Sequence, residues 1–406
     1  MKAMEKEIII VLHSLAIGGA ERRLSSVANY MADKGIKVHM LLIDSPAVCF
    51  DIDKRVKVVC VNQNVDKGLY DPEKCELFTL ESKPETSAAD KLRLRAYRLA
   101  DKKKAEYLEA ELYLKNTFAI PLREYIKQYP NAVVVSFMTI PNISLMMAMR
   151  DLPNRALFGD CCDISTEYPA GSPYNEMRRK YYPRANGAIF QTPAERDYYT
   201  FLPDIEKYVI PNFIRGELFP ERFEGERRKD IVNFCRLNPA KDLPLLIDAF
   251  ALFHKDLPEY TLSIYGEGGL KDKLTEQINA LGLRNCAKIY PFDKEVHKII
   301  RDAAMFVSSS YREGISNSML EALAIGMPCV CTDCAGGGAK MMIEDHENGL
   351  LVPVKDADAL YLAMKEAAEN KELAEKISRN AVKIKERLKP EKICDAMIAA
   401  ILGEKG

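Results

Sequence analysis

The chain has 406 residues, of which 48% are hydrophobic, so it can build two cores, and two domains of about 200 residues each are expected. Its net charge of −1 and its sequence pI of 6.6 argue against a protein that coats nucleic acid. Its 11 cysteines form no closely spaced framework, and the first residues lead into a strand rather than an apolar signal core, which predicts a cytoplasmic location.

The first half of the chain alternates short apolar runs with helical patterns, which predicts a parallel sheet with helices on both faces. Residues 7–12 form a β-branched run, and Gly18 and Gly19 follow just before a helical stripe that begins at Leu24. The two glycines let the backbone approach an anion, although a plain tight turn explains them equally well and they form no GxGxxG motif. Further strands of this half are expected at 38–43, 56–59, 132–137, 155–158, 187–191 and 208–210.

A basic segment lies between Lys91 and Lys104. It holds seven Lys or Arg residues and one Asp, interleaved with Leu92, Leu94 and Leu99. One interpretation is a basic helix that rests on an anionic membrane surface or meets a phosphorylated acceptor. The other is a solvated helix face, which is what most charge runs are.

The pattern of strands restarts after Pro211 and Asn212, where residues 216–229 are charged and linker-like. We place the domain boundary there, with residues 1–212 as the first domain and residues 213–387 as the second. A helix within residues 388–406 is expected to cross back to the first domain. The strands of the second domain are expected at 231–235, 261–265, 287–290, 305–308, 328–332 and 349–352.

Two cations follow the first strand of the second domain. Arg236 and Lys241 come just past its carboxyl end, which is where ligands bind in open α/β sheets. Two cations at that place suit a diphosphate, whereas each of them alone would be an ordinary surface charge.

The most informative stretch is 311–323, where an apolar strand gives way to a helix. Glu313 and Gly314 occupy the turn, and the unpaired N–H groups of the helix start form an anion site. Glu321 follows Glu313 by eight residues, so two carboxylates, which accept hydrogen bonds from diols, flank a phosphate-sized site, as a nucleotide sugar requires. In the alternative interpretation Ser318 and Glu321 form a capping box and Glu313 is a solvated loop acid. Three residues have side chains that can cap the start of this helix: Ser316, Asn317 and Ser318.

Cysteines raise the alternative of a metal site. Cys329, Cys331 and Cys334 are close in sequence, but the first two fall in an apolar strand and no zinc-finger spacing follows them. Cys161 and Cys162 are interpreted in the same way, as small buried side chains. We therefore expect no metal site.

In combination, these residues resemble the retaining glycosyltransferases of family 4, which have the GT-B fold. The likeness covers nearly the whole chain and rests on four charged residues in order, with three shorter stretches that match as well. One of these stretches, at 18–22, resembles the amino-terminal loop of the family subgroup that builds bacterial surface polysaccharides and lipid-linked glycans. It implies an α/β protein with two Rossmann-like, doubly wound domains that face each other across a cleft, the first binding the acceptor and the second the donor. The residues and stretches that carry it are Arg236, Lys241, Glu313, Glu321, Gly-Gly-Ala-Glu-Arg at 18–22, Ile-Pro-Asn at 210–212 and Asn-Gly-Leu-Leu-Val at 348–352.

The resemblance also implies roles for individual residues. Arg236 and Lys241 would bind the donor diphosphate and Glu313 the hydroxyls of the transferred sugar, which makes these three the catalytic set. Glu321 would bind the ribose diol. No metal and no cofactor is implied. The rest of the implied donor site is Gly18, Gly19, Gly314, Ile315, Ser316 and Asn317.

The chain departs from the family pattern at three places, none of which touches the four charged residues. Phe137 and its neighbours stand where many members have a histidine near the sugar, Ile315 replaces the usual Phe, and Lys340 stands about where a Glu is common. The departures bear on the identity of the sugar and on the acceptor geometry.

The predicted function is that of a retaining glycosyltransferase, of hexosyltransferase type, in cell-surface polysaccharide or glycoconjugate synthesis. It moves a sugar from a nucleotide-diphosphate donor, with a UDP-sugar as the first expectation, to a glycan or lipid-linked acceptor, in the cytoplasm or peripherally on the inner face of the membrane. One alternative is a nucleotide-sugar epimerase of the same fold, which needs further acids or a histidine in the cleft, and none of the five histidines adjoins these motifs in sequence. The other is a non-catalytic nucleotide-sugar-binding protein.

Overall fold

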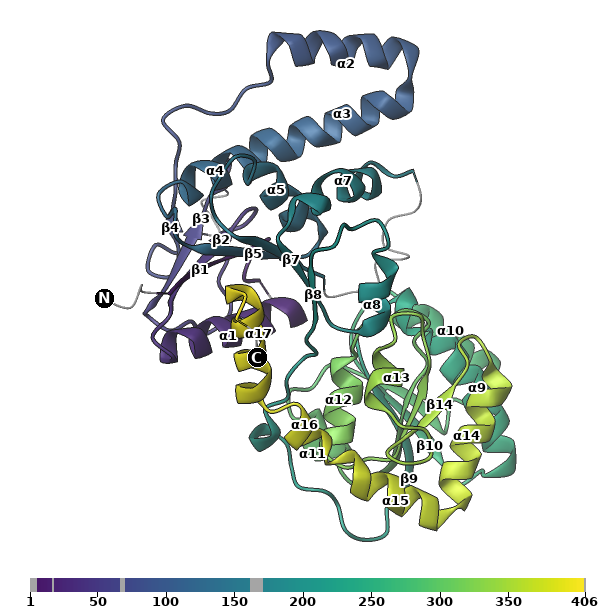
Figure 1. The fold of residues 1–406 in the computed structure, drawn as a ribbon. Coiled ribbons are helices and arrows are strands. Elements are labelled where there is room, and N and C mark those ends of the chain that lie inside the picture. The colour runs from purple at the N-terminus through teal and green to yellow at the C-terminus, as the bar shows by residue number, and fades with distance from the viewer. Residues whose placement is uncertain (1–5, 17, 66–69, 161–170, 405–406) are drawn as a thin grey trace. The chain divides into compact units, whose positions relative to one another are not determined.

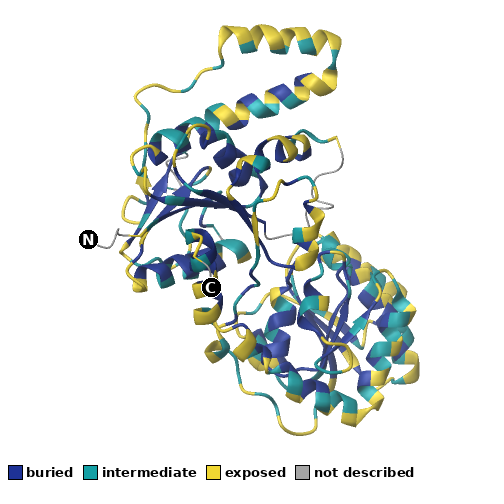
Figure 2. Cartoon of the chain, in the orientation of Figure 1, coloured by how far each residue is buried: buried dark blue, intermediate teal, exposed yellow. Residues whose placement is uncertain are grey.

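The computed structural model describes residues 6–16, 18–65, 70–160 and 171–404 (Figure 1). The chain divides into two compact units. Unit 1 comprises residues 1–190, 196–210 and 394–406, and unit 2 comprises residues 191–195 and 211–393. Each unit has one parallel β-sheet with helices packed against it and a buried apolar core of its own (Figure 2).

The sheet of unit 1 has eight parallel strands in the order β4-β3-β2-β1-β5-β6-β7-β8. Its central strand β1 reads EIIIVL, and five of its six residues are buried, because β-branched side chains suit the pleated backbone and helices cover both faces of a parallel sheet. The short strand β4 falls between the strands expected at 56–59 and 132–137, where the sequence predicts none. The strands are β1 (Glu7–Leu12), β2 (Lys37–Leu42), β3 (Val56–Cys60), β4 (Glu76–Leu77), β5 (Val133–Phe137), β6 (Ala156–Gly159), β7 (Gly187–Phe190) and β8 (Glu206–Val209).

Helices flank this sheet on both sides, with α1 on one face and α4 and α5 on the other (Figure 1). Helix α8 begins in unit 2, and α17 enters unit 1 at Cys394. The helical segments are α1 (Gly19–Asp33), α2 (Ala88–Ala100), α3 (Lys102–Leu114), the π-helical turn η2 (Lys115–Ala119), α4 (Ile120–Ile126), α5 (Thr139–Ala148), α7 (Pro173–Tyr181), the 3-10 turn η3 (Tyr182–Arg184), α8 (Pro193–Tyr198) and α17 (Pro390–Leu402).

The basic segment from Lys91 to Lys104 is not the single helix that its sequence predicts. Asp101 is extended, with φ −157° and ψ 97°, and separates α2 from α3. Its side chain accepts a hydrogen bond of 3.1 Å from Lys104 N and so caps α3, as Asp does at helix starts. The two helices form a hairpin (Figure 1), which Arg98 and Glu109 link through an ion pair of 2.8 Å.

The sheet of unit 2 has six parallel strands in the order β11-β10-β9-β12-β13-β14. The order runs one way from β9 to β11 and the other way from β12 to β14, so it reverses between β9 and β12, as in a doubly wound fold. The strands are β9 (Arg228–Phe234), β10 (Thr261–Tyr265), β11 (Ala287–Tyr290), β12 (Ala303–Ser308), β13 (Cys329–Thr332) and β14 (Leu350–Val352).

Helices connect these strands, and the helical part of residues 357–387 is divided into three helices. Asn370 ends α14, and its side chain accepts a hydrogen bond of 3.0 Å from Leu373 N, which caps α15. The helical segments are η4 (Gly216–Leu218), η5 (Pro239–Lys241), α9 (Leu243–Asp256), α10 (Lys271–Ala280), α11 (Val296–Ile300), α12 (Asn317–Ala324), α13 (Gly338–Met342), α14 (Ala357–Glu369), α15 (Lys371–Ala381) and α16 (Ile384–Arg387).

Within the described part of the chain, no helix has the length and apolar character needed to cross a membrane. The apolar run 132–149 divides at Met138 into β5 and α5, and Pro141 lies in the first turn of α5.

Candidate functional site

The charged residues of unit 2 gather where the strand order of its sheet reverses. Strands β9 and β12 are neighbours there, with Val232 paired to Phe306. The loops that follow them, 235–241 and 309–316, therefore leave the same edge of the sheet side by side. In open α/β sheets this reversal point is where ligands bind.

Lys241 and Glu313 meet at this edge. The Lys241 Nζ atom lies 2.5 Å from Glu313 Oε2, and both side chains are largely buried, with 15% and 23% of their surface exposed. Two hydrogen bonds hold the loops together around the pair: Ser309 Oγ donates to Lys241 O at 2.9 Å and Tyr311 N donates to Ala240 O at 3.1 Å. The structure therefore brings together two of the three predicted catalytic residues.

Arg236, the third predicted catalytic residue, is exposed two residues after the end of β9. Its carbonyl accepts a hydrogen bond of 2.9 Å from Asn238 N, and Leu237 N donates to Glu267 O at 2.8 Å, so the backbone around it is fixed. Arg236 thus lies in a hydrogen-bonded turn at the same edge of the sheet as Lys241.

Helix α12 starts at this edge, and its cap differs from the one in the alternative interpretation. Ser316 is the N-cap residue, and its hydroxyl accepts a hydrogen bond from Met319 N, so Ser318 and Glu321 do not form the capping box. The helix begins at Asn317, three residues after Gly314, so its first N–H groups lie at the loop edge of the sheet.

Glu321 lies in the second turn of α12, and a histidine that the sequence did not single out binds it. The His297 Nε2 atom is 3.0 Å from Glu321 Oε2, with 19% and 16% of the two side chains exposed. The expectation that no histidine lies beside these motifs is therefore wrong: His297 is distant from Glu321 in sequence but contacts it in the folded chain. No spacing signal could have found this contact, because the two residues are 24 positions apart on separate helices.

The glycines at 336–338 allow two backbone segments to touch. A Cβ atom on Gly336 would lie 1.9 Å from Glu313 O, and one on Gly338 would lie 1.8 Å from Gly314 O. Real Cβ atoms do not come that close, so glycine is required for this approach rather than for a sharp turn alone. The glycine loop thereby supports the turn that carries Glu313.

Polar side chains of unit 2 anchor the start of α12, and two of them, Gln191 and Thr192, are not among the site residues predicted from the sequence. Gln191 Nε2 donates to Asn212 Oδ1 at 2.9 Å, and Asn212 Nδ2 donates to Asn317 Oδ1 at 3.2 Å. Thr192 Oγ1 donates to Gly336 O at 2.7 Å. Ile315, a predicted donor-site residue, has a buried side chain.

Burial disfavours the thiolate form of Cys235 beside the site and of Cys331 in β13. Burial, opposed by Lys241 and assisted by Glu313, raises the pKa of Cys235 to about 12, and burial also raises the pKa of Cys331 to about 12. Neither is a nucleophile or a thiolate ligand at neutral pH. Among the residues that the structure describes, no group of three or more His, Cys, Asp or Glu side chains could hold a metal ion. Cys161 and Cys162 lie outside the described residues.

Gly18 and Gly19 belong to unit 1, whereas the other predicted site residues belong to unit 2. Gly18 precedes α1 and Gly19 is its first residue. The Glu21 carboxylate lies against Gly18, since a Cβ atom there would be 2.0 Å from Glu21 Oε2. The start of α1 thus already has an acid beside it.

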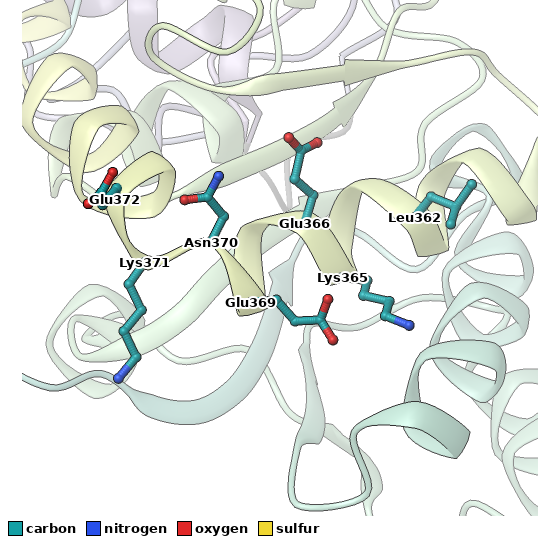
Figure 3. Close-up of a pocket in the computed structure, with 7 residues that line it drawn as sticks. All are labelled: Leu362, Lys365, Glu366, Glu369, Asn370, Lys371 and Glu372. Atoms are coloured by element: carbon teal, nitrogen blue, oxygen red, sulfur yellow. The ribbon is translucent and has the colours of Figure 1, made fainter.

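A surface hollow of about 720 Å³ lies elsewhere in unit 2, at the junction of α14 and α15 (Figure 3). Its charges do not converge on one point, because Glu366 points away from Lys365 and Glu369. Lys365 is engaged by Asp256 at 2.6 Å. The hollow contains none of the predicted residues, and its chemistry favours no particular ligand.

Two doubly wound parallel sheets, with cations, a helix start and two acids at the reversal point of the second, define a two-unit α/β protein with a candidate anion site. Comparison with known families makes this class specific. Residues 215–384 match the family model described as "Glycosyl transferases group 1", so this stretch carries a glycosyltransferase group 1 domain.

A relative of similar length comes from Campylobacter jejuni subsp. jejuni. It is N-acetylgalactosamine-N,N'-diacetylbacillosaminyl-diphospho-undecaprenol 4-alpha-N-acetylgalactosaminyltransferase, which is 27% identical over 378 residues, or 90% of each chain. Two crystal structures share the fold. S. aureus TarM has a TM-score of 0.71 at 15% identity over 98% of this chain and 99% of its own. Anabaena HepE in complex with UDP has a TM-score of 0.70 at 18% identity over 98% of this chain and 100% of its own.

These findings confirm the predicted fold class, two α/β units of the GT-B type. They favour a glycosyltransferase over both the epimerase and the non-catalytic binding protein. Assignment to the subgroup with the Gly-Gly-Ala-Glu-Arg loop stays a prediction.

Proposed function

We propose that this chain is a retaining glycosyltransferase that moves a sugar from a nucleotide-diphosphate donor, first of all a UDP-sugar, to a lipid-linked or glycan acceptor. The observation that carries the proposal is the Lys241–Glu313 pair beside the start of α12 at the reversal point of unit 2. The relative from C. jejuni acts, by its name, on a diphospho-undecaprenol acceptor, which supports a role in cell-surface glycoconjugate or polysaccharide synthesis. We assign donor binding to unit 2 and acceptor binding to unit 1.

The proposed chemistry follows from where charge develops. The bond between the anomeric carbon and the β-phosphate oxygen breaks, and the acceptor oxygen forms a new bond on the same face of the sugar. The acceptor proton passes to the departing phosphate. Negative charge then grows on the β-phosphate, and Arg236, Lys241 and the N–H groups at the start of α12 stabilise it. Retention agrees with the alpha-linked product named for the relative.

The acids hold the two ends of the donor in this scheme. Glu313 accepts hydrogen bonds from the hydroxyls of the transferred sugar and Glu321 from the ribose diol. Gly314, Ser316 and Asn317 supply backbone and side-chain groups between them. Gly18 and Gly19 keep their predicted role as donor-binding residues of unit 1.

We further propose that transfer needs no metal ion and no cofactor, since two cations and a helix start supply the positive charge that the leaving group needs. Treatment with EDTA is expected to leave turnover unchanged. A loss of activity that Mg²⁺ or Mn²⁺ restores would contradict this.

The test of the assignment is donor binding and turnover in Arg236→Ala and Glu321→Ala variants. Each variant is expected to bind UDP about tenfold or more weakly, since each loses a charge-assisted hydrogen bond. Lys371→Ala, in the hollow of Figure 3, serves as the control. Full affinity and full turnover in both variants would contradict the assignment. The anomeric configuration of the product, measured by NMR, tests retention.

We also propose that the enzyme is cytoplasmic and contacts the inner face of an anionic membrane through α2. No residue of α2 is buried, and Leu92 and Leu99 are 69% and 92% exposed (Figure 2). These leucines are seven positions apart and so share a helix face, which Lys91 and Arg95 flank on one side and Arg93 on the other. An apolar strip with basic edges suits the interface of an anionic bilayer.

Vesicle flotation tests this contact. Lys91→Gln/Arg95→Gln removes two charges worth roughly 1 kcal/mol each near an anionic surface, so binding to vesicles with phosphatidylserine should weaken by about 30-fold. Lys271→Gln/Lys273→Gln, on the exposed side of α10, is the charge-matched control and should bind normally. Equal flotation of all three proteins, or none by the unsubstituted protein at low salt, would refute the contact.

A further inference from the structure

His297 is held in one orientation by three elements of unit 2. Its ring meets the rings of Phe219 and Phe234 edge to face, with centroid distances of 4.9 Å and 5.4 Å. Phe219 follows η4, and Phe234 is the last residue of β9. A ring fixed on two sides has little freedom to turn, and its Nε2 atom is directed at Glu321.

The direction of the hydrogen bond follows from the acid. An ionised carboxylate can only accept, so Nε2 of His297 carries the proton and donates to Glu321 Oε2 at 3.0 Å. A carboxylate with one oxygen fixed in this way cannot rotate without losing a charge-assisted bond. Glu321 therefore presents a defined orientation at the edge of the site.

We propose that His297 is a positioning residue that sets the preference of the enzyme for donors with a complete ribose diol over 2′-deoxyribonucleotide donors. The inference rests on the proposed function, in which Glu321 accepts from that diol. A diol demands two acceptor contacts in fixed geometry, whereas a single hydroxyl tolerates a carboxylate that moves. Loss of His297 should therefore weaken the discrimination between ribose and 2′-deoxyribose more than it weakens the binding of the diphosphate.

The experiment measures dissociation constants by calorimetry for UDP and 2′-deoxy-UDP, and for the GDP and ADP pairs, in the unsubstituted protein and in variants. The unsubstituted protein is expected to prefer one ribonucleotide over its deoxy partner by about tenfold or more. In His297→Leu the preference for the ribonucleotide should fall by about threefold to tenfold, because the Glu321 side chain must then be immobilised when the diol binds. Affinity for the deoxynucleotide should change by less than about twofold.

Two further variants separate positioning from general damage. His297→Gln keeps an N–H donor and should restore most of the preference. His254→Leu removes a histidine of α9 whose Nδ1 lies 3.2 Å from Tyr260 O, away from the site, and should leave the preference intact. Because the preference compares two ligands on the same protein sample, a fraction of unfolded protein does not alter it.

The outcomes are distinct. An unchanged preference in His297→Leu overturns the inference while the proposed function stands. Failure of the unsubstituted protein to bind any of the three diphosphates overturns the proposed function and the inference with it. A preference that Glu321→Ala retains shows that Glu321 does not contact the diol, which also overturns the inference.

Discussion

The Lys241–Glu313 pair shows how one residue contact constrains the chemistry. At 2.5 Å the carboxylate neutralises the ammonium that the donor diphosphate is proposed to use. A diphosphate that enters must therefore draw Lys241 away from Glu313 or share it. The pair thus sets a cost on binding of the bare nucleotide that a sugar able to engage Glu313 would offset.

Glu313→Gln should separate these two effects. Without the competing charge, UDP is expected to bind more tightly by about 1 kcal/mol, or roughly fivefold, while turnover falls by about a hundredfold or more because the sugar loses its partner. Calorimetry measures the affinity for UDP, and steady-state kinetics measure the turnover. Weaker UDP binding, or turnover near that of the unsubstituted protein, would contradict this account of the pair.

His39 in β2 is a residue whose titration affects stability. Burial, assisted by Lys57 and Lys37, lowers its pKa to about 4, although the Glu76 carboxylate alone would raise it. The Glu7 carboxylate, 3.4 Å from Nε2, also favours the charged ring, but burial outweighs it. The folded state therefore holds this ring neutral at a pH at which an unfolded chain, with its ordinary pKa of about 6.5, would protonate it.

The sign of the pH effect follows. Because the unfolded chain binds more protons between pH 6.5 and 4, unit 1 loses stability as the pH falls through this window, by up to about 3 kcal/mol. His39→Gln should reduce the difference between thermal midpoints at pH 7 and pH 5. Titration of the ring by NMR checks the pKa itself, and a value near 6.5 would refute the prediction.

At the scale of elements, the turn before α12 depends on the glycine loop against it. Gly336→Ala should displace the Glu313 carbonyl, which would lie 1.9 Å from the new Cβ, and so lower both donor affinity and the unfolding midpoint. Gly269→Ala is the matched control, since a Cβ there meets nothing within 4 Å. Thermal unfolding and UDP binding measure the two variants. Equal midpoints and affinities would show that the loop adjusts freely.

Some elements could be predicted because their signal is local. The β-branched run of β1 identifies a buried strand, and the carboxyl-end rule places Lys241 and Glu313 at one edge of a sheet. The break at Asp101 could not be predicted, because an Asp inside a basic run is equally compatible with a helix interior and with a cap.

Long-range contacts were beyond prediction for a different reason. Gln191 reaches Ile315 N at 3.5 Å across 124 positions, and His297 reaches Glu321 from another helix. Neither residue stands at a recognisable spacing from its partner. Such pairs depend on how connected elements pack, which one sequence does not encode locally.

At the scale of the whole molecule, unit 1 depends on residues 394–406. Met397 and Ile401 are 0% and 1% exposed, and Arg155 Nε donates to Ile401 O at 3.1 Å. Burial of each apolar side chain contributes about 1.5–3 kcal/mol, a large part of the 5–15 kcal/mol that typically stabilises a folded protein.

Truncation after residue 393 should therefore unfold unit 1 and leave unit 2 largely protected, as hydrogen exchange would show peptide by peptide. Truncation after residue 402 is the control. It removes the surface ion pair of Lys6 and Glu404, which is worth at most about 1 kcal/mol. Native exchange throughout unit 1 after the longer truncation would refute the dependence.

The passage of the chain between units after residues 190, 195, 210 and 393 has a consequence for protein synthesis. A ribosome that adds roughly 5–20 residues per second needs on the order of 10–40 s to proceed from residue 190 to residue 394. Through that interval the nascent unit 1 lacks the helix that contributes Met397 and Ile401, and its apolar surface stays open to water. We expect the nascent chain to bind chaperones during this delay. Slow codons between residues 190 and 394 would lengthen the delay and should therefore lower the yield of folded protein.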